Sequence, residues 1–436
     1  MSVLSNSTTL IVITCQGHLI ESLLQMLKHT IVANTIYQLL GKFISVSATL
    51  LVTVFITRSL GVETFGQFSI VISYIAPFYV FADFGINAIV ARQFSKDGLL
   101  IANYFKSILF LRITISIALI AVGILLLIFI PYTPQVKLSI TIGLLTVLAQ
   151  AIFNTSQIIF QVKSRYKLFA VSQIVGSLFL VLTTFFLAKY GFGVFYIIFT
   201  FVLSNILTSI VSLFVIRKDT KSAISIIDKK YLKEILILSA PLGISLVLNT
   251  LMVNADRFLL SVMTTSASVG SYFLAYKLFE ILLVIPTFFM NSVYPYMARI
   301  ADKPGNSFKD ILAKSVLILT ALSLMATLGT IIFGKTIISL IWGEGMVGSY
   351  QPLIILTAGS VIFFITSPLS WALIAKDRQK TFPMIYGIGL LFNVIANWIL
   401  IPRYNFIACA YTTVATEFLV LLLLLFQFSK LNRVSP

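Results

Sequence analysis

Long apolar runs dominate the chain, and short polar stretches separate them. A helix that crosses a bilayer needs about 20 predominantly apolar residues. Twelve runs of this kind occur, six on each side of the longest polar interruption: 34–57, 66–90, 106–130, 138–162, 168–188, 193–216, 236–260, 268–296, 312–333, 351–375, 380–401 and 405–428. The pattern predicts an all-α integral membrane protein with about twelve transmembrane helices.

The longest polar interruption, Arg217–Glu234, divides the predicted helices into two groups of six. We therefore expect two six-helix bundles in five regions: an N-terminal extension at 1–30, a first bundle at 31–216, a cytoplasmic linker at 217–234, a second bundle at 235–430 and a tail at 431–436. Met26 is an alternative translation start, because a charged stretch that enters the first helix follows it directly. A signal peptide is not expected, since no cationic segment precedes Leu10–Thr14.

Lysine and arginine are concentrated in every second connection between the predicted helices. Twenty-three of them lie in the N-terminus and near 92–112, 163–167, 217–233, 299–314, 376–380 and 430–433, whereas the alternate connections hold only 5. Basic residues favour the cytoplasmic side of a membrane protein. The bias predicts that both termini lie in the cytoplasm, and we expect an inner-membrane protein.

A short internal repeat relates the two halves. The segment Phe65–Phe68 (FGQF) opens the second predicted helix, and Val269–Tyr272 (VGSY) opens the eighth. Each half has six predicted helices and therefore the same orientation in the membrane. The repeat is thus expected to be parallel rather than inverted.

Composition supports the membrane class and excludes several others. Hydrophobic residues make up 59% of the chain and charged residues only 10%, against about 25% charged in soluble domains. The net charge of +17 would suggest nucleic acid in a soluble protein, but here the charges mark topology, so no nucleic-acid partner is expected. The two cysteines and two histidines have no metal-ligand spacing. No nucleotide-binding or hydrolase motif is present, and we expect neither a metal nor a cofactor.

Polar residues recur on one helical face of several predicted spans. Such a stripe can line a polar path through the membrane, or it can simply hold helices together at about 0.6 kcal/mol per hydrogen bond. We expect a substrate path that involves Lys42, Lys277, Asn34, Gln38, Gln150, Asn154, Gln157, Asn249 and Asn291, with Arg112 at its cytoplasmic end.

Five ionisable residues inside the predicted spans are stronger candidates, namely Lys42, Asp83, Lys277, Glu280 and Glu417. A charge at the bilayer centre costs at least about 2.5 kcal/mol and needs a partner or a wet cavity. Lys277 and Glu280 are three residues apart, so they could also simply pair with each other. The dipeptide at 256–257 falls near the outer end of its span, where a solvated or locally paired role is the simpler interpretation.

Several motifs are similar to those of a known family. They are Asn34–Tyr37, Arg58–Gly66 (RSLGVETFG), Asp83–Asn87 (DFGIN), Asp256–Phe258 and Ala415–Glu417. With them the chain resembles the Wzx-type O-antigen flippases of the polysaccharide transporter family. The superfamily of these flippases also holds multidrug (MATE) extruders and lipid II flippases. The resemblance covers the chain from about residue 30, and its most specific part is R-x-L-G-x-E-x-F-G. The long N-terminus departs from the family pattern.

The resemblance implies a MATE-like fold and a function. An undecaprenyl-diphosphate-linked oligosaccharide would move from the cytoplasmic to the periplasmic leaflet by alternating access. Lys42 and Lys277 are then candidates for binding the diphosphate. Asp83, Glu280 and Glu417 are candidates for ion or proton coupling, because burial favours a neutral carboxylic acid. The implied partners are the lipid-linked oligosaccharide, membrane lipids, and the polysaccharide polymerase and chain-length regulator of the same pathway.

Three other functions remain open. A MATE-like drug or cation antiporter on the same fold would need acidic residues to dominate its cavity. A lipid II flippase is expected to have fourteen transmembrane spans, whereas this chain has room for about twelve. A membrane-embedded polymerase or ligase would carry a large outer loop with catalytic residues, but the longest outer connection, Gly334–Gln351, is short. We therefore do not expect an enzyme.

Overall fold

The structure is a computed structural model that describes the backbone of residues 4–94, 101–220, 227–301 and 307–434. Side chains are described within these ranges from residue 37 to residue 430, except at 39, 42 and 101–103. The described residues form helices and short connections, as the apolar runs predict. The expectations for residues 1–30 and for the start at Met26 lie outside the described side chains and stay predictions.

The first bundle is built from seven helices. They are α1 (Leu4–Asp83), α2 (Ile86–Gln93), α3 (Ile101–Leu126), α4 (Pro134–Gly143), α5 (Leu145–Val162), α6 (Tyr166–Lys189) and α7 (Val194–Thr220). Short helices α4 and α5 follow each other and together form one crossing, since the candidate span runs from Pro134 to Val162. Pro134 occupies the first turn of α4, where its missing N–H costs nothing.

The second bundle contains six longer helices and two short 3₁₀ turns. They are α8 (Lys229–Met263), α9 (Ser266–Ile300), α10 (Ser307–Trp342), η1 (Glu344–Ser349), α11 (Tyr350–Ala375), η2 (Gln379–Thr381), α12 (Phe382–Tyr404) and α13 (Phe406–Val434). Asp228 caps the start of α8, because its carboxylate accepts a hydrogen bond from the Tyr231 backbone N–H at 3.0 Å. The helix α8 thus begins inside the range predicted as a linker.

Among the described residues, 11 helices are long and apolar enough to cross a membrane. The first of these, Phe43–Gln93, has 51 residues, far more than the roughly 20 that one crossing needs. Gly61 has non-helical backbone angles inside it, with φ 81° and ψ 176°, and divides α1 into two arms. The positive φ favours glycine at this corner. Counting the arms separately gives twelve crossings, in agreement with the predicted fold class.

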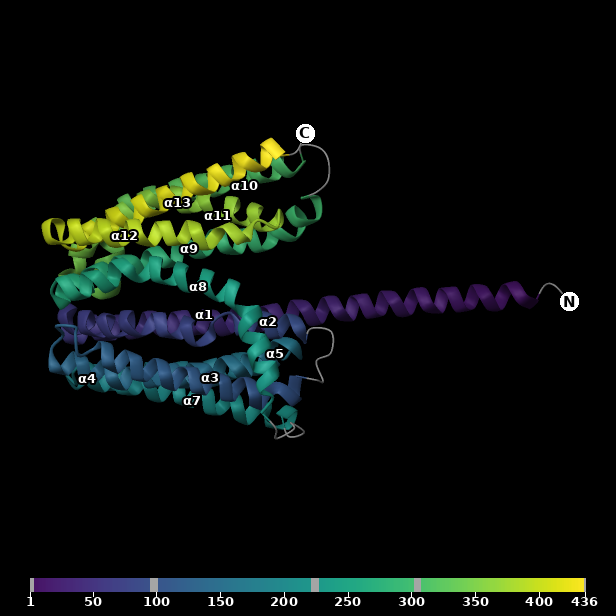
Figure 1. The fold of residues 1–436 in the computed structure, drawn as a ribbon, viewed down its shortest axis with the longest axis horizontal. Coiled ribbons are helices and arrows are strands. Elements are labelled where there is room, and N and C mark those ends of the chain that lie inside the picture. Colours follow the sequence, from purple (N-terminus) through teal and green to yellow (C-terminus); the bar gives the residue numbers. More distant parts are fainter. Residues whose placement is uncertain (1–3, 95–100, 221–226, 302–306, 435–436) are drawn as a thin grey trace.

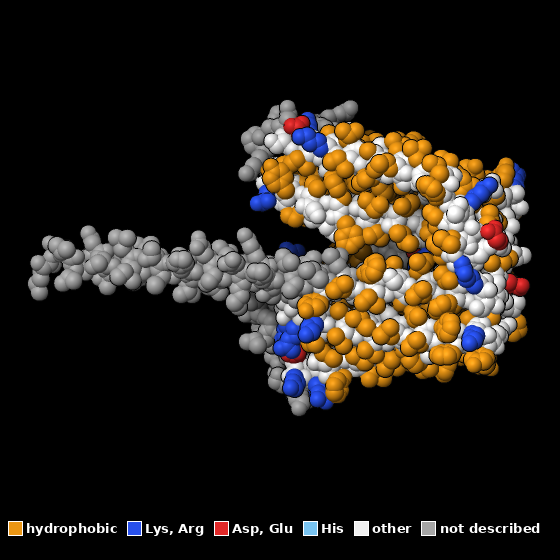
Figure 2. Space-filling model, turned by 180° about the vertical axis from the view of Figure 1, so that it is seen from behind, with side chains coloured by type: hydrophobic (Ala, Val, Ile, Leu, Met, Phe, Trp, Pro, Cys, Tyr) orange, Lys and Arg blue, Asp and Glu red, His pale blue; other side chains and the backbone are white. Residues whose placement is uncertain are grey.

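The two bundles lie side by side and separate toward one end of the molecule (Figure 1). The C-terminal part of α13 lies at this end. Figure 2 shows the space between the bundles as a cleft that is open at this end and closed at the other. We call them the open end and the closed end. The basic connections predicted to share a side also meet at the open end, where Lys163 pairs with Asp219 at 2.9 Å.

At the closed end the two copies of the internal repeat meet. A Cβ added at Gly66 would lie 1.7 Å from the Ser266 carbonyl oxygen, and one added at Gly270 would lie 2.6 Å from the Val62 carbonyl oxygen. Only glycine permits this approach of α1 and α9. Nearby, the Trp342 indole N–H donates to Thr53 Oγ1 across the bundles at 2.9 Å. The repeat thus marks the contact that closes the cleft.

The apolar core follows the same plan. The largest cluster of buried residues draws from both bundles, with Ile75 and Ile198 from the first and Leu274 and Leu356 from the second. A second cluster lies within the first bundle but includes Tyr231 and other residues at the start of α8. The helix α8 therefore starts against the first bundle and ends in the second, so it physically connects them.

Candidate functional site

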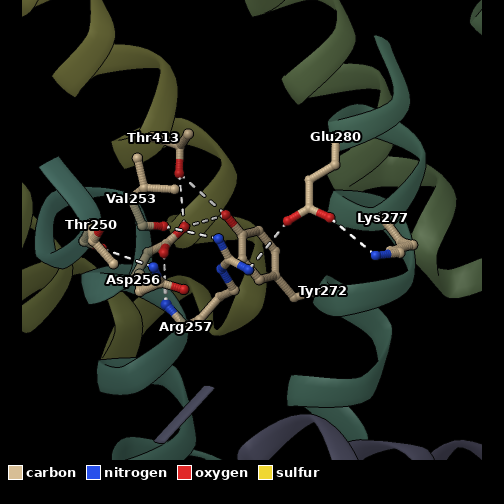
Figure 3. A network of polar contacts seen from close by, with 9 residues as sticks. Thr250, Val253, Asp256, Arg257, Tyr272, Lys277, Glu280 and Thr413 are labelled. Atoms are coloured by element: carbon tan, nitrogen blue, oxygen red, sulfur yellow. Dashed lines mark hydrogen bonds and ion pairs between the residues drawn. The ribbon is translucent and has the colours of Figure 1, made fainter. Parts of the chain in front are cut away.

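A cluster of charged side chains lies between α8 and α9 of the second bundle (Figure 3). Glu280 is placed between two cations, at 3.5 Å from the Arg257 guanidinium and 3.3 Å from the Lys277 ammonium. The guanidinium also lies 4.1 Å over the ring of Tyr276, a favourable cation–π geometry. The cluster therefore holds two positive charges and one negative charge, and we call Arg257, Lys277 and Glu280 the cationic cluster.

Asp256 anchors this cluster from the protein interior. Its side chain is buried, and its carboxylate accepts hydrogen bonds from Tyr272 Oη and, at 2.9 Å, from Thr413 Oγ1. A third bond comes from the backbone N–H of Arg257 at 2.7 Å. A buried carboxylate needs such donors to offset its desolvation. The network ties α8, α9 and α13 together and fixes the backbone from which Arg257 projects.

We infer from helix geometry that the cationic cluster borders the cleft. Gly270, which touches the first bundle, and Lys277 are seven residues apart on α9, or about two helical turns, so they share one face. The bundles touch at Gly270 and separate from there toward the open end, so this face of α9 borders the cleft. The side chain of Glu280 is 39% exposed and that of Lys277 is 26% exposed. Both can therefore meet a ligand that enters from the open end.

The sequence-based interpretation of Asp256 and Arg257 was wrong. It treated them as a solvated or local pair near the outer end of the span, whereas both side chains are buried and organise the cluster. The predicted span stopped at 260, but α8 continues to Met263, which places the dipeptide deeper. Their position within an apolar helix was the available signal. The alternative interpretation of Lys277 and Glu280 as a local pair is confirmed, although Arg257 makes the pair a triad.

Four buried polar residues connect α12 and α13 beside this site. Asn397 donates from its amide to Asn393 Oδ1 at 2.9 Å and accepts from Thr412 Oγ1 at 2.8 Å. Asn393 in turn donates to Thr416 Oγ1 at 3.1 Å. Glu417, predicted as a coupling residue, follows Thr416 directly and is also buried. These groups form a polar strip inside the second bundle.

A second ion pair lies in the first bundle. The Arg112 side chain is fully buried and donates to the Asp83 carboxylate at 2.7 Å and to Asn87 Oδ1 at 3.0 Å. Asp83 itself is 22% exposed. The sequence placed Arg112 at the cytoplasmic end of its span, which stays a prediction; the structure shows that its side chain is buried between α1 and α3. The separation of 29 residues hid its partner from any local pattern.

Gln150 and Asn154 join each other rather than the cationic cluster. The Gln150 amide donates to Asn154 Oδ1 at 2.9 Å. Gln150 also lines a cavity of about 90 Å³ enclosed by α1, α5, α6 and α7, together with Thr49, Gln173 and Asn205. A polar space of this size has room for a few water molecules. The polar stripes of the first and fourth spans therefore converge inside the first bundle.

The remaining predicted path residues are dispersed. Gln38 and Asn291 are exposed, whereas Gln157 and Asn249 are partly buried. The side chains of Asn34 and Lys42 lie outside the described part of the chain, so their roles stay predictions. The structure brings Lys277 and Glu280 together with Arg257, but the Asp83–Arg112 pair belongs to the other bundle.

In the described part of the chain, twelve crossings in two bundles, with a cleft between them and ion pairs in each, define a multi-pass membrane protein. The fold is similar to that of the lipid II flippase MurJ in an inward closed conformation, with a TM-score of 0.75, 18% identity, and coverage of 90% of this chain and 87% of MurJ. It is also similar to an inward-facing multidrug resistance MATE family transporter of the MOP superfamily, with a TM-score of 0.72, 14% identity, and coverage of 92% and 100%. A MOP superfamily transporter from Pyrococcus furiosus gives a TM-score of 0.60 and 15% identity, with coverage of 92% and 96%.

Sequence comparison identifies the family. Residues 31–301 match the model of the family described as polysaccharide biosynthesis protein, and the chain belongs to this family. It is also similar to the capsular polysaccharide biosynthesis protein CapF of Staphylococcus aureus, with 25% identity over 195 residues. That alignment covers 44% of this chain and 48% of CapF, so it spans about half the length of this relative.

Proposed function

We propose that this protein is a flippase for lipid-linked oligosaccharides in the inner membrane of a bacterium. Its substrate would be an undecaprenyl-diphosphate-linked repeat unit of O-antigen or a similar surface polysaccharide, moved from the cytoplasmic to the periplasmic leaflet. The observation that carries the proposal is the cationic cluster, in which Arg257 of α8 and Lys277 of α9 share Glu280. The family assignment supports a role in polysaccharide biosynthesis.

A diphosphate has the chemistry that this cluster can recognise. Arg257 offers a planar fork of N–H donors that matches phosphate oxygens, and Lys277 adds a compact charge. The low dielectric of a membrane-embedded cleft strengthens their attraction for an anion. Glu280 contacts both cations, so the diphosphate would take its place. Lys42, from the first bundle, is the further cation that the sequence suggests.

The charge balance of the cluster argues against the rival cation antiporter. Two cations share one carboxylate in the part of the cleft wall that is described, whereas a site for a cationic drug needs the opposite excess. Asp83 is paired with Arg112 inside the first bundle. Asp256 keeps its charge, but it is buried behind Arg257 and held there by neutral donors, so it offers no accessible carboxylate to a cation. We therefore favour an anionic cargo.

The basic open end is expected to face the cytoplasm, since 23 of the lysines and arginines lie on that side of the predicted topology. The cleft would then be open toward the leaflet where the substrate is made. Asp83, Glu280 and Glu417 are our candidates for coupling. Glu280 is the best placed of them, because a proton on its carboxylate would free Arg257 and Lys277 for the diphosphate. No enzymatic step is proposed.

Deletion and complementation test this function in cells. Loss of the gene should abolish surface polysaccharide and cause lipid-linked single repeat units to accumulate. Wild-type protein should restore the polysaccharide, while the double variant Arg257→Ala/Lys277→Ala should not, although it reaches the membrane in normal amount. Lys314→Ala, which removes an exposed lysine of α10, is the matched control and should restore it. Full polysaccharide in the double variant would remove the cationic cluster from the mechanism.

A further inference from the structure

An apolar groove lies between the two bundles, on the side where α1 and α3 face α8 and α12. Its volume is about 510 Å³. Tyr74, Phe78 and Phe129 line it from the first bundle, and Phe258, Leu259 and Val394 line it from the second. Because its walls belong to different bundles, its shape must change whenever the bundles move relative to each other. We call it the lateral groove.

The polar atoms of the lateral groove are turned away from it. The Tyr74 hydroxyl donates to the Gly123 carbonyl of α3 at 2.6 Å, which leaves the aromatic ring to face the groove. The Asn254 amide donates to the Thr250 carbonyl of its own helix at 2.8 Å. An occupant therefore meets only hydrocarbon surface. At this depth in a bilayer such a surface suits a hydrocarbon chain and disfavours a sugar or a phosphate.

The lateral groove and the cationic cluster use adjacent faces of one helix. On α8, Asn254 and Phe258 border the groove, and Arg257 lies between them in sequence but projects toward Glu280. With a helical period of about 3.6 residues, Arg257 is rotated by roughly 60° from Asn254 and by roughly 100° from Phe258. One stretch of α8 thus presents a site for an anion and a site for a hydrocarbon chain at the same level.

We propose that the lateral groove holds the polyprenyl chain of the lipid-linked substrate while the diphosphate binds the cationic cluster. This inference rests on the proposed function and specifies where the lipid part of the substrate lies. The pairing of a cationic site with an apolar slot is what an amphiphile with a diphosphate head and a long tail requires. The lateral groove opens sideways between the bundles. The polyprenyl chain can therefore remain in the membrane while the diphosphate and its oligosaccharide cross.

A second apolar groove supplies an internal comparison. It has a volume of about 500 Å³ and lies between α10 and α13, with Ala313, Leu317 and Phe428 in its lining. Both walls belong to the second bundle, and none of the three residues of the cationic cluster comes from α10 or α13. We assign this groove to ordinary membrane lipid. The two grooves are similar in volume; the comparison groove also has Lys309 in its lining, but only the lateral groove adjoins the cationic cluster.

Photocrosslinking of the full-length protein distinguishes the two grooves. Benzoylphenylalanine replaces Phe129 in the lateral groove or Phe428 in the comparison groove, in vesicles of phosphatidylethanolamine and phosphatidylglycerol. The probe is radiolabelled undecaprenyl diphosphate. We expect labelling at position 129 to exceed that at position 428 by at least about ten-fold, a preference of about 1.4 kcal/mol. Unlabelled undecaprenyl diphosphate should remove it, whereas added phospholipid should not. Equal labelling at both positions would overturn the inference.

Filling the groove provides an independent test. Ala255→Trp places a large ring in the lateral groove, and Ala313→Trp does the same in the comparison groove. We expect the first variant to lower oligosaccharide transport in vesicles at least about ten-fold and the second to leave it unchanged. Equal transport by both variants would contradict the groove assignment but not the proposed function. Wild-type protein that is labelled at position 129 yet moves no oligosaccharide would contradict the proposed function and support the groove as a lipid site.

Discussion

At the scale of single residues, the molecule holds the buried charges Arg112 and Asp256 by pairing each with fixed partners. Arg112 has no exposed surface, and its bonds to Asp83 and Asn87 supply the counter-charge and acceptors that burial demands. Asp256 is satisfied by neutral donors instead. The cationic cluster differs, because two of its three members remain accessible from the cleft. Charges that serve stability are therefore enclosed, and charges available to a ligand are exposed.

The Arg112–Asp83 pair should contribute mainly to stability. Arg112→Ala leaves a carboxylate without its partner, and we expect a loss of about 3 kcal/mol in the free energy of unfolding. The double variant Asp83→Ala/Arg112→Ala should lose less than the sum of the two single variants, because no unpaired charge remains. Thermal unfolding of the purified protein in detergent measures both effects. Additive losses would show that the two residues do not support each other.

Residue roles could be predicted only where partners are close in sequence. The spacing of Lys277 and Glu280 indicated their pairing correctly. Arg257 was missed, because its partner Glu280 is on the next helix and its location depends on how far α8 extends beyond the predicted span. The ion pair of Arg112 was missed for the same reason, since Asp83 is distant in the chain. Tertiary contacts between helices, which no single-helix pattern contains, decide these cases.

At the scale of helices, the hydrophobic pattern was sufficient to predict the number of crossings but not the positions of bends and breaks in the helices. The apolar runs predicted twelve crossings correctly, because the membrane imposes length and composition directly. The bend at Gly61 inside α1 and the break between α4 and α5 came from local backbone geometry. The weak repeat around Gly66 and Gly270 proved informative, since these glycines are where the bundles touch.

The glycine contact should control closure at this end. Gly66→Leu adds a side chain where a Cβ alone would lie 1.7 Å from the Ser266 carbonyl oxygen, so the bundles must separate. Spin labels at Lys137→Cys and Lys335→Cys, with Cys15 and Cys409 replaced, report the distance between the bundles. We expect the measured distances to lengthen in Gly66→Leu.

The matched control is Gly329→Leu, because Gly329 has no atom within 4 Å of its added Cβ. This variant should leave the distance distribution between the labels unchanged. An unchanged distribution in Gly66→Leu as well would mean that the glycine contact does not hold the closed end together.

At the scale of the whole molecule, an open end, a closed end and a helix that joins the bundles form the parts that alternating access requires. The starting turns of α8 pack on the first bundle through Tyr231, whose ring lies 4.1 Å from that of Tyr104. The rest of α8 carries Asp256 and Arg257 into the second bundle. When the bundles move relative to each other, α8 must therefore bend or shift. Because α8 carries Arg257 of the cationic cluster, ligand binding at the cluster would be coupled to closure of the cleft.

Coupling to protons can be read from transport at different pH gradients. If a carboxylate such as Glu280 must gain a proton to release its cations, an imposed gradient should change the rate of oligosaccharide transport in vesicles. Glu280→Gln, which keeps the shape but not the charge, should remove this dependence. Equal rates with and without the gradient in wild-type protein would contradict proton coupling while leaving the flippase function intact.

The most direct measurement follows the leaflet occupied by the substrate. Purified protein is placed in vesicles with a lipid-linked oligosaccharide, and an impermeant glycosidase added outside reports the fraction exposed. In empty vesicles only the outer leaflet, about half of the lipid, should be digested. Active protein should make nearly all of it accessible, and Arg257→Ala/Lys277→Ala should return the result to that of empty vesicles. Digestion that stops at the outer leaflet with folded wild-type protein present would contradict the flippase function.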